Sequence, residues 1–329
     1  MNMVKTRCDY LDEISGLFII HMILWHCFQN AGMMDCSVYR ILSRLFFFFM
    51  PWFFYKSGIF FNPQKTFKEI VSAGFKRLLI PFISFFLMGL LCWMVHLFFT
   101  SGLSVTAAVV NPMKELLLYG SCNGNLALWF LLTLFFVRIL YWIVSKVPCS
   151  SVVQIVVLFG LVVLCSNFGP HKPYYVGNTF LGLFFFSLGR ATFSPLQGEG
   201  GKRNLLIAVS GFVWLSVVLF DWTRGDARTN AGRLYEGWLL ASVAGILAVN
   251  FLGAKKNRKL GILSKIGRSS MVYFVVHWPL IILIKAFLVD LLGWENHLKV
   301  LCVMIFFLLI SLPLISWFVN RKMKWIVGA

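Results

Sequence analysis

Two histidines and a glutamine lie in the first apolar stretch of the chain, where ionisable side chains are costly. The stretch reads DYLDEISGLFIIHMILWHCFQN and contains His21, His26 and Gln29. An ionisable group at membrane depth indicates a functional position unless its neighbours satisfy it. Because imidazole accepts and returns a proton near neutral pH, His26 is a candidate general base. His21 faces other neighbours on a helix, and a buried histidine bonded to a nearby hydroxyl or carbonyl is the alternative interpretation.

A third histidine stands in a later apolar stretch, MVYFVVHWPLI. His277 lies about two turns inside the helix expected at 269–289, at a depth close to that of His26. The two residues are predicted to line one cavity, although packing beside Pro279 would also explain a buried histidine. The eight cysteines are scattered without a C-x-x-C pair. We therefore expect no metal site and no disulfide framework.

Ten apolar stretches must position these residues. Each has about the 20 residues that a helix needs to cross the hydrocarbon core, and each is apolar on all faces. We expect membrane-spanning helices at 14–31, 41–61, 78–99, 126–145, 150–168, 176–193, 205–221, 235–252, 269–289 and 298–319. The sequence thus predicts an all-α, polytopic integral membrane bundle that forms a single transmembrane domain over residues 1–329.

The charged residues support this topology. Hydrophobic residues make up 59% of the chain and charged residues 13%, with 30 Lys and Arg and a net charge of +18. The expected outer loops hold few of these cations: Arg40, Lys114, Lys172, Arg224, Arg228 and Arg233. This positive-inside bias places both termini in the cytoplasm, and it predicts a lipid bilayer, not nucleic acid, as the partner of the basic chain. The basic segment 255–268 faces anionic headgroups or an anionic cytosolic ligand.

Other polar residues fall at unusual depths. Cations lie inside or at the edges of the expected spans: Arg44, Lys56, Arg138, Arg190 and Lys285. The outer loop 221–236 reads DWTRGDARTNAGRLYE, whose side chains suit sugar hydroxyls and acidic groups. The alternative interpretation is that this loop is simply solvated.

The order of these motifs resembles the acyltransferase 3 family of bacterial membrane O-acyltransferases, which includes O-acetylases of surface polysaccharides. Arg7, Asp12, Gly16 and His26 stand at the spacing of the first-helix motif of that family. Later family signatures resemble LWFLLTLF, LGLFFFSLG and GRSSMVYFVVHWPLI, the last of which contains His277. The resemblance extends over essentially the whole chain.

A second family feature is a basic segment that leads into an apolar helix with a proline. FKRLLIPF at 75–82 repeats it with Lys76 and Arg77. Two positions depart from the family pattern. Ser15 stands where a basic residue is usual, and Gly74 replaces the first arginine of an Arg-x-x-Arg pair.

The resemblance implies a multi-pass O-acyltransferase of the bacterial inner (cytoplasmic) membrane. Acetyl-CoA or another acyl-CoA would be the donor, and a sugar hydroxyl of a cell-surface polysaccharide or its lipid-linked precursor the acceptor. His26 would be the catalytic histidine, as a base or through an acyl-histidine. Lys76 and Arg77 would bind the CoA phosphates from the inner side.

Asp12 lies about 21 Å from His26 along a helix, so it is expected to be a structural or donor-site residue at the cytoplasmic end. Two other functions stay open. A transporter or flippase for lipid-linked glycan would require inverted repeats with broken helices, which the sequence does not display. A non-catalytic partner in polysaccharide assembly is suggested by the departures at Ser15 and Gly74.

Overall fold

The computed structural model describes residues 8–100, 102, 104–167, 173–196, 201–254 and 261–328, and these contain helices but no β-strand. Six helical runs in this part of the chain are long and apolar enough to cross a membrane: Asp9–Asn30, Phe67–Thr100, Leu126–Val144, Tyr235–Ala254, Ser270–Leu291 and His297–Lys322. The chain is therefore an all-α, multi-pass membrane protein. The number of ten spans and the position of the two termini stay predictions.

All ten predicted stretches are helical, but the second is not one helix. It consists of α2 (Ser37–Leu45) and α3 (Phe49–Ile59), separated by a turn at 46–48. Pro51 lies in the first turn of α3. A proline has no N–H to donate, and its ring collides with the carbonyl four residues earlier, so a helix cannot continue undistorted through this point. The single span predicted for 41–61 is thus wrong.

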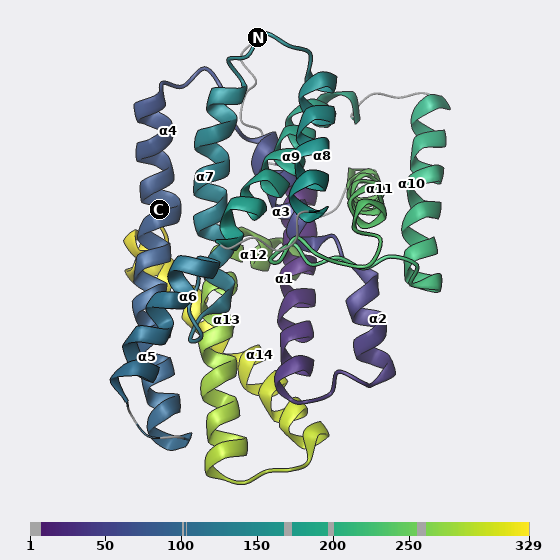
Figure 1. Ribbon diagram of the computed structural model, residues 1–329. Coiled ribbons are helices and arrows are strands. Elements are labelled where there is room, and N and C mark those ends of the chain that lie inside the picture. Colours follow the sequence, from purple (N-terminus) through teal and green to yellow (C-terminus); the bar gives the residue numbers. More distant parts are fainter. Residues whose placement is uncertain are drawn as a thin grey trace.

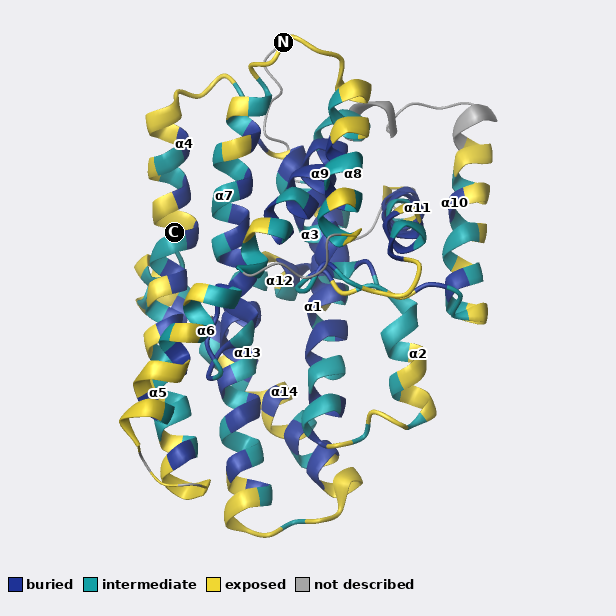
Figure 2. Cartoon of the chain, in the orientation of Figure 1, coloured by how far each residue is buried: buried dark blue, intermediate teal, exposed yellow. Residues whose placement is uncertain are grey.

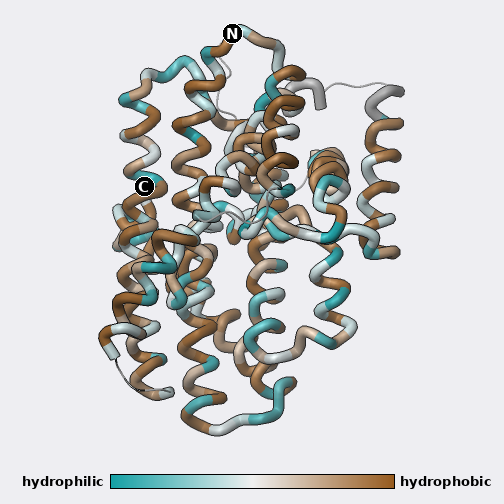
Figure 3. Tube along the Cα trace, viewed as in Figure 1, coloured by the Kyte–Doolittle hydropathy of each residue, from teal (hydrophilic) through white to brown (hydrophobic). Residues whose placement is uncertain are grey.

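The bundle has a buried centre and a rim of exposed side chains, and different helices form the two. The centre is formed largely by α1 (Asp9–Asn30), α3, α9 (Tyr174–Leu196) and α11 (Tyr235–Ala254). Figure 2 shows exposed residues along α5 (Ile80–Thr100) and α10 (Gly201–Phe220), and Figure 3 shows that much of this surface is hydrophobic. Phe98 and Phe212, for example, are 66% and 74% exposed. Apolar side chains in such positions are expected to contact lipid.

Two glycines allow α1 to approach α12 (Ile262–Arg268) closely. A Cβ atom at Gly16 would collide with the backbone of Leu263, and one at Gly267 would collide with the carbonyl of Asp12. The next helix, α13 (Ser270–Lys285), begins directly after α12. The glycine contact therefore sets α13 alongside α1.

The third predicted span forms a long rod at one edge of the bundle (Figure 1). It consists of α4 (Phe67–Gly74), a π-helical turn at Phe75–Leu79 and α5. Pro81 follows the turn and removes one N–H from the helical hydrogen bonds. A π turn shifts the register of side chains, and such turns are frequent at functional sites. Here the turn contains Arg77, whose side chain lines an internal pocket.

Candidate functional site

The first and ninth predicted spans bring two histidines together. The imidazole of His26 on α1 stacks on that of His277 on α13, with ring centroids 5.4 Å apart and an interplanar angle of 23°. The indole of Trp278 closes the other side of His26 at 4.7 Å, edge to face. His26 is partly exposed, whereas His277 is completely buried. His26 is thus the more accessible member of the pair.

The hydrogen bonds of His277 define which of its two ring nitrogens carries the hydrogen. Its Nδ1 faces only backbone carbonyl oxygens, that of Phe274 at 2.7 Å and that of Tyr273 at 3.2 Å. Because carbonyl oxygens only accept, Nδ1 carries the hydrogen and Nε2 has a free lone pair. This Nε2 is buried and has no partner among the described residues. His277 thus offers an unused proton acceptor beside His26.

A short polar chain holds His26 in place. Its Nδ1 lies 2.9 Å from Oε1 of Gln29, one turn further along α1. The amide of Gln29 in turn donates from Nε2 to the hydroxyl of Tyr39 on α2 at 3.2 Å. An amide oxygen can only accept, so His26 donates from Nδ1 and presents Nε2 as the base. Sequence spacing placed Gln29 on the face of His26, but Tyr39 was not predicted.

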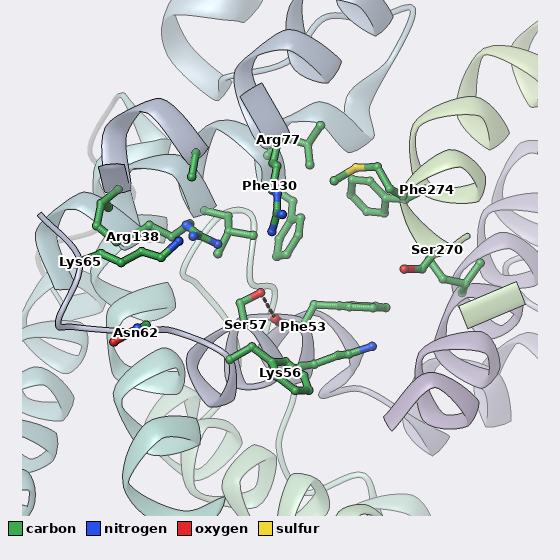
Figure 4. A pocket seen from close by; sticks show the side chains of 17 residues that line it. Phe53, Lys56, Ser57, Asn62, Lys65, Arg77, Phe130, Arg138, Ser270 and Phe274 are labelled. Carbon is green, nitrogen blue, oxygen red and sulfur yellow. Dashed lines mark hydrogen bonds between the residues drawn. The ribbon is translucent and has the colours of Figure 1, made fainter. Parts of the chain in front are cut away.

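A pocket of about 390 Å³ lies next to this pair. Its wall includes Phe274, whose carbonyl accepts from His277 and whose ring centroid lies 6.3 Å from that imidazole. Phe53 and Phe130 line the centre of the pocket, and cationic side chains occupy the opposite end from Phe274 (Figure 4). Neither histidine is among the lining residues, so the pocket meets the pair only through Phe274.

No Asp or Glu is among the residues that line this pocket. Four cations do line it: Lys56, Lys65, Arg77 and Arg138. Figure 4 shows the nitrogen atoms of Lys65 and Arg138 directed into the same end. Nε of Arg138 is buried without a hydrogen-bond partner among the described residues. Like charges this close repel one another unless an anion joins them. The pocket can therefore hold a ligand with several phosphate groups.

The amine of Lys56 on α3 reaches Ser15 of α1, the position where the resemblance led us to expect a basic residue. Its Nζ donates to Ser15 Oγ at 2.5 Å and lies 3.3 Å from a carboxylate oxygen of Asp12. The other oxygen of Asp12 lies 3.5 Å from Nε of Arg268. The positive charge absent at Ser15 is thus supplied by α3. Asp12 thus lies in an ion-pair network with Lys56 and Arg268.

The remaining motif residues are distributed as follows. Lys76 and Arg77 are both exposed, but only Arg77 is among the residues that line the pocket. Gly74 packs against the ring of Phe135, and Arg138 stands one helical turn further along α7 (Trp129–Val144). Arg7 lies outside the described residues.

The structure also shows what sequence inspection missed. Lys65 belongs to an ordinary basic loop and gave no signal, while Lys56 and Arg138 were noticeable only as cations at membrane depth. The basic residues at 255–260 lie outside the described residues. Among the described residues no group of His, Cys, Asp and Glu could hold a metal ion.

The loop between α10 and α11, which was predicted to be an outer loop, is well anchored. Asn230 donates to Asn178 of α9 at 3.0 Å, and Tyr235 donates to Asn230 at 3.2 Å. The carboxylate of Asp221 accepts from Arg224 and lies 3.1 Å from the guanidinium of Arg44. These contacts with Arg224 lower the pKa of Asp221, and the charge of Arg44 adds to the effect.

Comparison with known proteins gives a family but no individual relative. The family described as an acyltransferase domain matches residues 9–316, nearly the whole chain and all of the site residues above except Arg7. No protein of curated function and no solved structure matches. With its apolar helices, its paired histidines and this match, the chain belongs to the acyltransferase 3 family of membrane acyltransferases.

Proposed function

We propose that this protein is an O-acyltransferase of the bacterial inner membrane. It moves an acetyl or similar acyl group from a CoA thioester to a sugar hydroxyl of a cell-surface polysaccharide or its lipid-linked precursor. The observation that carries the proposal is the stack of His26 on His277, which meets through Phe274 a pocket lined by four cations.

The distribution of charged and apolar side chains along the pocket suits an acyl-CoA. Phosphate groups at the end formed by Lys65, Arg77 and Arg138 would receive charge-assisted hydrogen bonds. The pantetheine arm is narrow and would lie along Phe53 and Phe130. The thioester would then end beside Phe274, next to the histidines.

His26 would act first as a base. Its Nε2 takes the proton of the acceptor hydroxyl while the hydroxyl oxygen forms a bond to the thioester carbonyl carbon. When the carbon–sulfur bond breaks, His26 returns the proton to the leaving sulfur and CoA departs as a thiol. The Nε2 of His277 can accept a hydrogen bond from the hydroxyl and thereby orient it.

A two-step route uses the same groups. His26 Nε2 would attack the thioester carbonyl, and the carbon–sulfur bond would break to release CoA as a thiolate. The sugar hydroxyl would then attack the acyl-histidine, His277 would accept its proton and His26 would leave as neutral imidazole, after which the proton passes from His277 to the thiolate or to solvent. Two protonated imidazoles so close would repel each other, so only one is expected to carry the extra proton at any time.

The experiment compares the unaltered protein with His26→Ala at matched membrane levels in a host that lacks the gene and makes a surface glycan. Ester-linked acyl groups on that glycan are measured by mass spectrometry. Acylation by the unaltered protein that falls by about 100-fold or more in His26→Ala supports the proposal, because general-base catalysis contributes about this much.

His21→Phe is the matched control. His21 is also a buried histidine of α1, but its ring packs edge to face on Phe46 and Phe49 rather than facing His277. We expect this variant to retain acylation. If the unaltered protein adds no acyl group although an acceptor is present, the transporter or non-catalytic partner becomes the better explanation.

A further inference from the structure

One arginine of the outer loop reaches inward instead of staying in solvent. Arg228 lies between α10 and α11, in the loop that Asn230 fastens to α9. Its guanidinium lies over the ring of Tyr119 at 5.0 Å, and one of its nitrogens lies 3.4 Å from the hydroxyl of Ser121. Ser121 is completely buried. The arginine is therefore held against the interior of the bundle.

Arg228 differs from Arg224 and Arg44 in having no ion pair. Arg224 and Arg44 both meet the carboxylate of Asp221, and Arg233 donates to the backbone carbonyl of that residue. Arg228 meets no carboxylate within ion-pair distance in the described part of the chain, and its Nε is buried without a partner. Burial lowers the pKa of this guanidinium, but an arginine stays charged. The carboxylates of Asp226 and Glu115 oppose this effect without forming an ion pair with Arg228, and a half-buried cation without an ion-pair partner is costly unless a ligand supplies a counter-charge.

A short series of contacts connects Arg228 with the histidines. Ser121 belongs to the tight turn that a bridge between Cys122 and Asn125 closes. Within this turn the carbonyl of Asn123 accepts from the indole of Trp278 at 3.3 Å. The same indole packs on His26. Arg228 and the tryptophan that packs on His26 therefore contact the same short segment, at Ser121 and Asn123.

We propose that Arg228 binds an anionic group of the acceptor, so that the preferred acceptor is a sugar bearing a carboxylate or a phosphate near the reacting hydroxyl. The inference rests on the proposed acyl transfer and names the class of its acceptor. A guanidinium has a planar fork of donors that matches either anion with two hydrogen bonds. The anion neutralises the buried charge and fixes the sugar beside His26.

The test measures sugar binding without a donor, by saturation-transfer NMR on the full-length protein in nanodiscs. Three probes are compared: methyl galacturonoside, its neutral methyl ester, and galactose 6-phosphate. We expect at least one anionic probe to bind about tenfold or more tightly than the ester, as a charge-assisted bidentate contact allows. The stronger of the two identifies the carboxylate or the phosphate as the natural group.

Arg228→Gln should remove this preference, and Arg228→Lys should keep part of it because charge remains while the fork is lost. The control is Arg40→Gln, which removes an exposed arginine from α2 and should leave the preference unchanged. Equal binding of acid and ester, no binding of any probe, or a preference that survives in Arg228→Gln would overturn the inference. Because no acyl group is transferred, failure here is separate from failure of the glycan acylation experiment.

Discussion

His26 and His277 stack with their ring centroids 5.4 Å apart, although they belong to the first and one of the last helices of the chain. The stack brings one partly exposed imidazole against one that is completely buried. The hydrogen bonds on their Nδ1 atoms leave both Nε2 atoms as acceptors. The pair thus combines a partly exposed base with a second, buried acceptor beside it.

His277→Phe should abolish most of the acyl transfer while keeping the fold. Phenylalanine fills nearly the same volume and keeps the stacking, but it has no nitrogen to accept a proton. We expect the rate of glycan acylation to fall by about 100-fold. Elution as a single species in detergent would show that the variant folds. Activity within a few-fold of the unaltered protein would mean that the buried Nε2 has no part in the reaction.

Gln29 is predicted to position His26. Gln29→Leu removes the oxygen that accepts from Nδ1, so the imidazole is free to rotate or to change its tautomer. We expect kcat to fall by about tenfold or more with little change in KM for the donor. Gln29→Glu keeps an oxygen at that place and should recover much of the rate. Equal rates for all three proteins would exclude a positioning role.

The cations of the pocket are predicted to bind the donor. Arg138→Leu removes a guanidinium from the pocket wall, and KM for acetyl-CoA should rise by about tenfold, the value of one charge-assisted hydrogen bond. Lys76→Gln is the control because Lys76 is exposed and outside the lining. If Lys76→Gln has the larger effect, the phosphates lie elsewhere. Initial rates against acetyl-CoA concentration decide the matter.

Gly16 is predicted to be irreplaceable for steric reasons. A methyl group there collides with the backbone of Leu263, so Gly16→Ala must push α12 away and should destabilise the protein by about 1–3 kcal/mol. Gly211→Ala is the matched control, since nothing lies within 4 Å of a Cβ atom there. Alanine suits a helix better than glycine, so this second change should be neutral or stabilising. Thermal unfolding in detergent compares the two.

The stability of the loop that contains Asp221 is predicted to depend on pH. Because its folded pKa is lowered by the hydrogen bond from Arg224, its stabilisation is fully present above the unfolded pKa of about 3.9 and is lost as the pH falls through the folded value. Arg224 is 60% exposed, so solvent limits the effect to about 1 kcal/mol or less. Asp221→Asn should lower Tm at pH 6, and the difference should shrink toward pH 3. A difference that grows in acid would contradict this assignment.

The sequence by itself determined the fold class and the first half of the site. Long stretches that are apolar on all faces have only one common solution in lipid, because a helix satisfies its backbone hydrogen bonds within the segment. A histidine inside such a stretch is exceptional, so His26 and His277 were visible without a structure. Pro51 was visible as well, but the break it causes between α2 and α3 was not predicted.

The tertiary structure decided which residues meet. Helical periodicity gives the face of a side chain but not the neighbour that it contacts, so the chain from His26 through Gln29 to Tyr39 depends on how α2 packs against α1. Lys56 reaches Ser15 only because α3 crosses α1 at that height. Arg228 lies in a loop, where no periodic pattern restricts the backbone, and its place near the histidines follows from contacts distant in sequence. Such contacts carry no local signal, and they define the site.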